Sequence, residues 1–599
     1  MATAAALAAA SACTPIPLPA ATPSFSGVPA TAPATSSEPA PTPTPTSISP
    51  TTAPTPVAGG TLHLAGGRDD GLFDTASNSG PTANLLRGLS RQLVSYRSGR
   101  QFSDVVRTVV ADAAEEVPLP IDGTTYTFHI RDGVSWDLPI PRPVTSTDFA
   151  RGIKRLCNPV DPAYQATYFS QTIAGMAAFC DGLRALGAKV TAKALRSYLE
   201  SHNPDGLRTP DEHTLVVTLT ASAGDFLNMM ALSAASALPI ESLAYLPGSD
   251  AARRHFVSDG PYRVASYVAG RSLRLIRNPV WSAAADPIRK AYADEVQVDF
   301  GTTAGGTGSG VADFSLGPLP PDARPVDPLD PLVESVTNGA ISYVVVNMHS
   351  TSQHVALRDL AVRAALAAAV DKSAIVDVVG GPDVAQPLGT VLPPQILGFR
   401  PGPGADQGAG GVPVTGDPLL ARAELAAAGH AQGIGLKLAY ADDGANGRVA
   451  QVLERAWKAA GISVTLTAVA PADVRALTTD PARQSAWDLL LPVAWRPDWY
   501  PNGARTLFVP LLSRAGGANY GGFDDPAVES LIARALAEPD ANKSADIWAQ
   551  ADRTATAAIP EVPLFTGRSF FVRSSRVQNW QWDASALPDW TNVWLAPAF

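Results

Sequence analysis

Residues 125–136 read TYTFHIRDGVSW, which is the clearest strand and turn in the chain. Polar and apolar side chains alternate from Thr125 to Ile130, the period of a strand with one buried face. Arg131-Asp132-Gly133 then supplies the residue types of a tight turn. A helix is expected shortly afterwards, because Thr147-Asp148 offers a cap and an acidic first turn, and Asn158-Pro159 ends it.

Similar patterns recur on both sides of this stretch. Alternating or apolar runs predict strands at 61–65, 214–219, 272–276, 296–298, 343–346 and 463–467. Helical patterns are found at 359–379, where Gly380-Gly381 ends one continuous run, at 417–429, at 446–460 and from 525 onward. The alternation of helices and strands in the second half predicts an α/β fold around an open mixed sheet.

The bulk composition narrows the function classes. The chain has 599 residues, enough for two or more domains, with 46% hydrophobic and 17% charged residues. A net charge of −10 argues against nucleic acid as a partner, since phosphate binding needs a basic face. The sequence holds no run of 18 apolar residues, so it predicts no membrane span.

The N-terminal segment carries a possible anchor. Ala10-Ser11-Ala12-Cys13 resembles a bacterial lipobox, in which the cysteine is acylated, so residues 1–13 are interpreted as a lipoprotein signal segment. No Lys or Arg precedes Cys13, and the true start is therefore expected upstream. Residues 14–58 contain thirteen prolines and predict a disordered tether. The alternative is an Ala-rich terminus with an incidental cysteine.

Catalytic and metal-binding motifs are missing from the sequence. It contains no G-x-S-x-G elbow, no S-x-x-K and no Walker A lysine. Its eight histidines are scattered, without H-E-x-x-H or an i,i+4 pair. We therefore expect no catalytic residues, no metal and no cofactor.

Several short blocks together carry a family resemblance. Residues 125–136 form the first block. The others are TSTDF at 145–149 with Lys154-Arg155, DGPYRV at 259–264, RNPVW at 277–281, VRAALAAAVDKSAIV at 362–376, LPP at 392–394 and the block around 519–528. Their order from about Gly59 to the C-terminus resembles the extracellular solute-binding proteins of family 5. These are the peptide- and oligopeptide-binding lipoproteins of ABC importers.

The resemblance implies a two-lobed, periplasmic-binding-protein-like fold of the class II (cluster C) type. Lobe one would span 59–340, with an extra subdomain at about 97–205, and residues 563–599 would return to it. Lobe two would span 341–562. Because the chain crosses the hinge twice, the lobes would close around a ligand.

The most informative candidate site is Trp495-Arg496-Pro497-Asp498-Trp499-Tyr500-Pro501. From the residues alone, a ligand loop and a turn with packed aromatics and a surface Asp are equally acceptable. The resemblance implies that Asp498 contacts the α-ammonium of a peptide, while Trp495, Trp499 and Tyr500 exclude water. Arg496 is a complication, because it could pair with Asp498 and leave the site structural.

Two further residues are candidates for ligand contact. Trp136 follows the turn at 131–133 and is either a ligand platform or a core residue. Asn347 follows the strand at 343–346, at the expected hinge, and either caps the chain reversal or contacts ligand.

The cysteines form the last candidate set. An odd count in a secreted protein suggests one pair and one cysteine with another role. Acylation of Cys13 would leave Cys157 and Cys180 as the available disulfide pair in an oxidising compartment. The alternative is two buried free thiols.

The leading hypothesis is a monomeric extracytoplasmic lipoprotein, anchored by lipid to the outer face of the cell membrane. It would capture short peptides for ABC permease subunits and would not be an enzyme. Three alternatives stay open: a family member for another solute such as a nickel chelate, an opine or a sugar; a secreted hydrolase; and a receptor that senses without transport.

Overall fold

The computed structural model describes residues 55–69, 74–76, 84–139, 141–302, 312–319, 330–401 and 414–597. Cys13 and residues 14–54 of the expected tether lie outside this part of the chain, as does most of the Gly/Thr-rich stretch at 301–310. Within the described residues, no helix combines the length and the apolar character that a membrane crossing requires.

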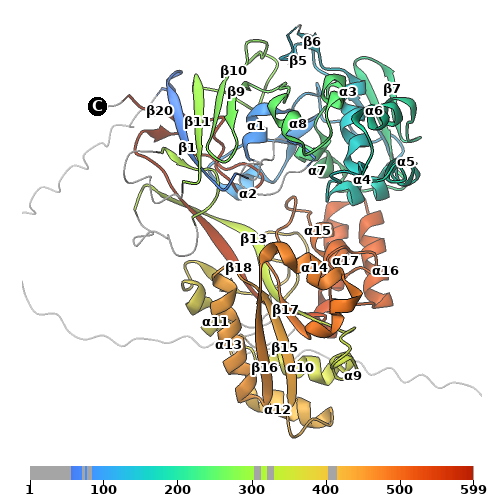
Figure 1. The fold of residues 1–599 in the computed structure, drawn as a ribbon, viewed down its shortest axis with the longest axis vertical. Coiled ribbons are helices and arrows are strands. Elements are labelled where there is room, and N and C mark those ends of the chain that lie inside the picture. The colour runs from blue at the N-terminus through green and yellow to red at the C-terminus, as the bar shows by residue number, and fades with distance from the viewer. Residues whose placement is uncertain are drawn as a thin grey trace, which may run out of the picture. The chain divides into compact units, whose positions relative to one another are not determined.

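Lobe one is built on a five-stranded sheet of order β12-β1-β11-β10-β9 (Figure 1). β1 runs parallel to both β11 and β12, whereas β10 is antiparallel to β11 and to β9. Buried Val296 and Val298 alternate with polar residues along β11, as expected for a strand with one face in the core. The strands are β1 (Thr61–Gly67), β9 (Tyr262–Val268), β10 (Ser272–Arg277), β11 (Glu295–Phe300) and β12 (Phe314–Ser315).

The extra subdomain of lobe one has a hydrophobic core of its own, which draws residues from Ala76 to Leu243 and also includes Trp499. The predicted strand at 125–130 forms β4, which pairs with β8, and β8 pairs with β7. A helix begins close to the predicted Thr147-Asp148, but its cap is Thr145, which forms a capping box with Asp148. The elements are β4 (Thr125–His129), β7 (Leu207–Asp211), β8 (Thr214–Thr218), α3 (Ser146–Lys154), α4 (Ala166–Thr172), α5 (Met176–Arg184) and α6 (Ala192–Ser201).

A disulfide joins Cys157, at the end of the short 3-10 turn that follows α3, to Cys180 in α5, with Cα atoms 5.2 Å apart. The closed loop contains α4 and the residues before it. Both cysteines are buried in the subdomain core, so the bridge ties two helices together from the inside.

Lobe two is built on a six-stranded sheet of order β14-β18-β13-β17-β15-β16, covered by helices (Figure 1). The predicted single helix at 359–379 is wrong in one respect, because it is divided into α10 and α11. Asp371 breaks it by accepting a hydrogen bond from the backbone of Ala374, which starts α11 anew. The elements are α10 (Leu360–Ala368), α11 (Lys372–Val379), β14 (Ala385–Pro387), α12 (Pro418–Ala427), β15 (Ile434–Ala441), α13 (Ala445–Ala459), β16 (Ile462–Val469) and β17 (Leu489–Leu491).

Two long antiparallel strands, β13 (Val333–Val346) and β18 (Glu561–Val572), pass between the lobes (Figure 1). β13 begins well before the predicted strand at 343–346. Its register shifts between Thr337 and Ile341, where Gly339 adopts a positive φ of 64°. A glycine tolerates that conformation without strain, and this irregularity hides the strand from a simple alternation pattern.

The remaining elements complete the two lobes. They are α1 (Leu86–Leu89), β2 (Val94–Tyr96), α2 (Phe102–Val105), β3 (Val109–Ala111), β5 (Ser135–Trp136), β6 (Arg142–Pro143), α7 (Phe226–Met230), α8 (Asp250–Arg254), α9 (His354–Arg358), α14 (Val474–Thr479), α15 (Arg505–Leu512), α16 (Pro526–Ala537), α17 (Ala541–Ala558), β19 (Val577–Gln578) and β20 (Trp594–Leu595).

Candidate functional site

A cavity of about 390 Å³ lies where segments of both lobes meet. Its volume falls in the range of small-molecule sites. Lobe one contributes α1, β2 and two loops, and the loop between β17 and α15 contributes the residues around Asp498. The lining residues in the described chain are Asn84, Leu86, Arg87, Gln92, Ser95, Tyr96, Tyr164, Gln165, Ala231, Leu232, Ser233, Ala494, Trp495, Arg496, Pro497, Asp498, Trp499, Asp583, Ala584, Ser585 and Leu587.

Asp498 is held by two phenols that come from the extra subdomain. Tyr164 donates its hydroxyl proton to Oδ1, and Tyr168 donates to Oδ2 at 2.7 Å. The backbone N–H of Asp498 donates to Thr506 Oγ1 at 3.2 Å. Each carboxylate oxygen can accept a second hydrogen bond, so the group keeps acceptor capacity for a ligand.

The electrostatics of Asp498 favour a cationic ligand. Burial raises its pKa above the ordinary value, and the two phenol hydrogen bonds and the charge of Arg496 act in the opposite direction. Arg496 itself donates to the carbonyl of Ser585 at 3.2 Å. A carboxylate with neutral donors in a desolvated setting gains most from a positive charge placed beside it.

The three aromatics of the same loop have different positions. Trp495 lines the cavity, and its indole N–H donates to the carbonyl of Thr506 at 2.9 Å. Trp499 is buried, lines the cavity and packs edge-on against the Tyr168 ring at 5.2 Å. Tyr500 is buried beneath the loop, where its hydroxyl donates to the carbonyl of Asn338. Tyr500 therefore supports the loop from below.

α15 adds a second contact between the loop and the extra subdomain. Arg505 lies 3.5 Å from Asp225, donates to Thr172 Oγ1 at 2.9 Å and sits over the Tyr168 ring at 5.6 Å. The side of the cavity that carries Asp498 is thus fixed to the subdomain by an ion pair, hydrogen bonds and ring packing.

The family of the chain follows from sequence comparison. Residues 108–516 match the model of the bacterial extracellular solute-binding proteins, family 5. The chain belongs to this family. Its members are solute-binding proteins of transporters and not enzymes.

Known proteins of similar length agree with this assignment. The oligopeptide-binding protein OppA of Bacillus subtilis is 24% identical over 85% of this chain and 90% of its own. Di/tripeptide-binding protein 4 of Pseudomonas aeruginosa is 26% identical over 82% of this chain and 86% of its own. The solved structure of clavulanic acid biosynthesis oligopeptide binding protein 2 is 26% identical, with a TM-score of 0.78 over 91% of this chain and 97% of that one.

Three residues predicted from the sequence, Tyr500, Trp136 and Asn347, do not line the cavity of this solute-binding protein. Trp136 is buried in the subdomain core, where its indole N–H donates to Asp148 Oδ2 at 2.9 Å. Asn347 is buried at the end of β13, donates to the carbonyl of Trp487 and accepts from the backbone of His349. Both side chains make hydrogen bonds within the fold, and neither lines the cavity.

Other cavity residues were missed by the sequence reasoning. Tyr164 lies just before α4 and Tyr168 lies in its first turn, and neither belongs to a recognisable motif. Only the fold brings them to Asp498. Arg87 and Asp583 are almost 500 positions apart in the sequence. The single available signal was the acidic and aromatic content of the C-terminal return.

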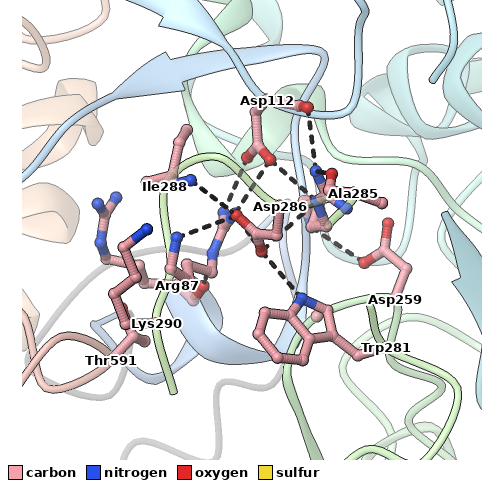
Figure 2. Close-up of polar contacts among 12 residues, drawn as sticks. Arg87, Asp112, Asp259, Trp281, Ala285, Asp286, Ile288, Lys290 and Thr591 are labelled. Carbon is pink, nitrogen blue, oxygen red and sulfur yellow. Dashed lines mark hydrogen bonds and ion pairs between the residues drawn. The ribbon is translucent and has the colours of Figure 1, made fainter. Parts of the chain in front are cut away.

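Arg87 connects the cavity to a buried ion network in lobe one. Its Nε donates to Asp589 Oδ2 at 3.0 Å, and its backbone carbonyl accepts from Arg289. Figure 2 shows Asp112, Asp286 and Asp259 around the guanidinium groups behind Arg87. Arg289 is bound to Asp112 at 2.9 Å and to Asp286 at 3.3 Å.

Arg91 completes this network, with its Nε 2.9 Å from Asp112 Oδ1. The two guanidiniums hold the pKa of Asp286 well below its usual range, against the opposing effect of burial. Burial instead raises the pKa of Asp259 to about 7; in the part of the chain that the structure describes, its side chain accepts just one hydrogen bond, from the backbone N–H of Arg91. The network fixes α1, the loop at 285–289 and the C-terminal return, and so supports the cavity wall.

Proposed function

We propose that the protein binds a short peptide between its lobes, with the α-ammonium of the peptide on Asp498. The observation that carries this proposal is the position of Asp498 in the cavity, where two phenols from the opposite lobe hold its carboxylate and, within the described residues, no guanidinium does. The names of the relatives, which describe oligopeptide and di/tripeptide binding, point to the same ligand class.

The physical reason lies in the cost of desolvating the ligand. An ammonium that leaves water for a closed cavity needs a fixed counter-charge, or its desolvation opposes binding. Asp498 meets that need through a charge-assisted hydrogen bond. Trp495 and Trp499 line the same cavity and exclude water from the contact.

Closure of the lobes is the second part of the proposal. Lobe one at 59–340, with the return at 563–599, would rotate against lobe two at 341–562 about β13 and β18. The hydrogen bonds from Tyr164 and Tyr168 to Asp498 would form on closure, because they cross from one lobe to the other. Ligand and phenols would then share one carboxylate in the closed state.

Delivery to an ABC permease and anchoring through an acylated Cys13 complete the proposal. The lipobox-like tetrad and the Pro-rich segment after it support the anchor. Replacing Cys13 by Ser should release the protein from membranes, and unchanged membrane partition would contradict the anchor.

Calorimetry with free and N-acetylated peptides tests the ammonium site. Asp498→Asn should fold normally and bind free peptides less tightly by about 2–5 kcal/mol, the range measured for buried charge pairs that lose one partner. Acetylated peptides should bind wild type poorly and lose little more in the variant. Asp132→Asn, at an exposed turn, serves as the control. Equal losses for both kinds of peptide would show that Asp498 does not bind the ammonium.

A further inference from the structure

The cavity contains a second acidic group, which belongs to a different segment from Asp498. Asp583 belongs to the C-terminal return and is only 6% exposed, yet it lines the cavity. Its Oδ1 accepts the backbone N–H groups of Ser585 and Leu587, at 2.8 and 3.0 Å. Among the described residues, its Oδ2 has no hydrogen-bond or ion-pair partner.

The charges around the cavity do not balance. Four charged residues line it in the described part of the chain: Arg87, Arg496, Asp498 and Asp583. Arg87 is neutralised by Asp589, which lies outside the lining. The remaining Arg496, Asp498 and Asp583 sum to one negative charge, whereas a peptide with uncharged side chains sums to zero. A ligand that balances this cavity carries one additional positive charge.

We propose that the peptide carries a basic side chain and that Asp583 binds its ammonium or guanidinium group. This inference rests on the proposed function, in which Asp498 takes the α-ammonium. A ligand with two positive groups contacts an acid on each lobe and therefore holds the lobes together. The guanidinium of Arg496 is the group left for the ligand carboxylate, because a backbone carbonyl is its one protein acceptor in the described chain.

The backbone geometry around Asp583 makes this site rigid. Residues 583–587 form a tight turn, in which the backbone N–H of Asp583 donates to the carbonyl of Leu587 and Ala586 has a positive φ of 57°. Since Oδ1 is fixed by two backbone donors, the carboxylate plane is set and Oδ2 has one orientation. A preorganised acceptor of this kind discriminates by charge without reorganising.

Matched peptides on wild-type protein give the first test. Lys-Ala and Ala-Lys are compared by calorimetry with the same dipeptides carrying norleucine, which keeps the methylene chain and removes the charge. The better lysine peptide should bind about 30-fold tighter than its norleucine counterpart, as a buried charge pair predicts. A ratio near one, or a preference for the neutral peptide, overturns the inference.

Asp583→Asn gives the second test, because an amide oxygen can still accept from Ser585 and Leu587. The lysine preference should fall to within about 3-fold, with norleucine peptides bound as in wild type. Asp552→Asn is the matched control: Asp552 is also buried and accepts two backbone N–H groups, from Val391 and Leu392, but it lies away from the cavity. This control should keep the wild-type preference.

The outcomes separate this inference from the proposed function. If no peptide binds wild type, the proposed function fails and the inference fails with it. If peptides bind but lysine and norleucine are equivalent, only the basic-peptide inference is overturned. If Asp583→Asn does not fold, the ratio of lysine-peptide to norleucine-peptide affinity on wild type still tests the preference for basic peptides.

Discussion

Two carboxylates of this protein are stabilised in different ways: Asp112, which is fully buried, and Asp498, which is partly buried. Asp112 is enclosed by the guanidiniums of Arg91 and Arg289, each at 2.9 Å. Asp498 is enclosed by the neutral hydroxyls of Tyr164 and Tyr168. The first group already has its positive charge from the protein, whereas the second has hydrogen bonds but no ion partner within the described chain.

This difference separates architecture from recognition. A carboxylate paired with arginine contributes to a fixed scaffold. Removing one charge of the pair leaves the other buried without compensation, which destabilises the fold. A carboxylate held by phenols is oriented but not neutralised, so a ligand cation can supply the missing charge. The chemical type of the partner therefore distinguishes the two carboxylates.

The largest expected effect concerns the scaffold. Asp112→Ala leaves two buried guanidiniums without their shared carboxylate and should lower the free energy of unfolding by about 3–5 kcal/mol. Thermal and denaturant unfolding measure it. Asp104→Ala is the control, since its ion pair with Arg107 is exposed, and it should change stability little. A small loss of unfolding free energy in Asp112→Ala would contradict the view that Asp112 stabilises the scaffold whereas Asp498 serves recognition.

The disulfide gives the next effect and connects subdomain stability to the Asp498 site. Replacing both Cys157 and Cys180 by Ser should cost about 3 kcal/mol, as expected for a loop of this length. The loop includes Tyr164 and Tyr168, so peptide affinity should fall as well, while the ion network of lobe one stays intact. Thiol titration of the denatured, unreduced protein checks the bridge, and two reactive thiols from this pair would contradict it.

Removing only the phenol hydroxyls is a smaller change. The double variant Tyr164→Phe, Tyr168→Phe should weaken peptide binding about tenfold, because the hydroxyls stabilise the closed state that the ligand needs. Calorimetry measures the affinity. Tyr198→Phe is the matched control, since its hydroxyl donates to the carbonyl of Phe179 within the same subdomain. Unchanged affinity in the double variant would mean that the phenols do not assist closure.

The smallest effect tests a third kind of buried acid. Glu561, at the start of β18, has a pKa raised to about 8, chiefly by burial and then by Asp552. The folded state keeps a proton that the unfolded chain has lost, so this group reduces stability as pH rises from about 4.5 to 8. Glu561→Gln should thus be relatively more stable at pH 6 than at pH 5, by about 1 kcal/mol. Unfolding curves at both pH values, with a constant difference between the proteins, would contradict it.

The sequence predicted features that depend on neighbouring residues. The strand β4 and the Asp417-Pro418 start of α12 follow from local backbone chemistry and are present. A helix also begins close to the predicted Thr147-Asp148, although its cap is Thr145. The break before α11 was missed, because an apolar helical pattern continues across it and only the cap by Asp371 interrupts the backbone.

The site was only partly predictable for the same physical reason. Asp498, Trp495 and Trp499 share one short segment, and a family resemblance marked it. Their partners come from distant segments: Tyr164 lies 334 positions from Asp498. Trp136 and Asn347 lie away from the cavity. Aromatic and amide side chains beside turns serve packing and backbone hydrogen bonding as readily as ligand contact, so the residue type alone does not mark a site.

The disulfide loop also determines where the protein can work. The covalent bond between Cys157 and Cys180 encloses both phenols that orient Asp498. In the reducing cytosol the bond does not persist, and in an oxidising compartment it does. A newly made chain should therefore hold peptides weakly before export and firmly afterwards. Because the bond forms only after export, the protein would not sequester peptides inside the cell that makes it.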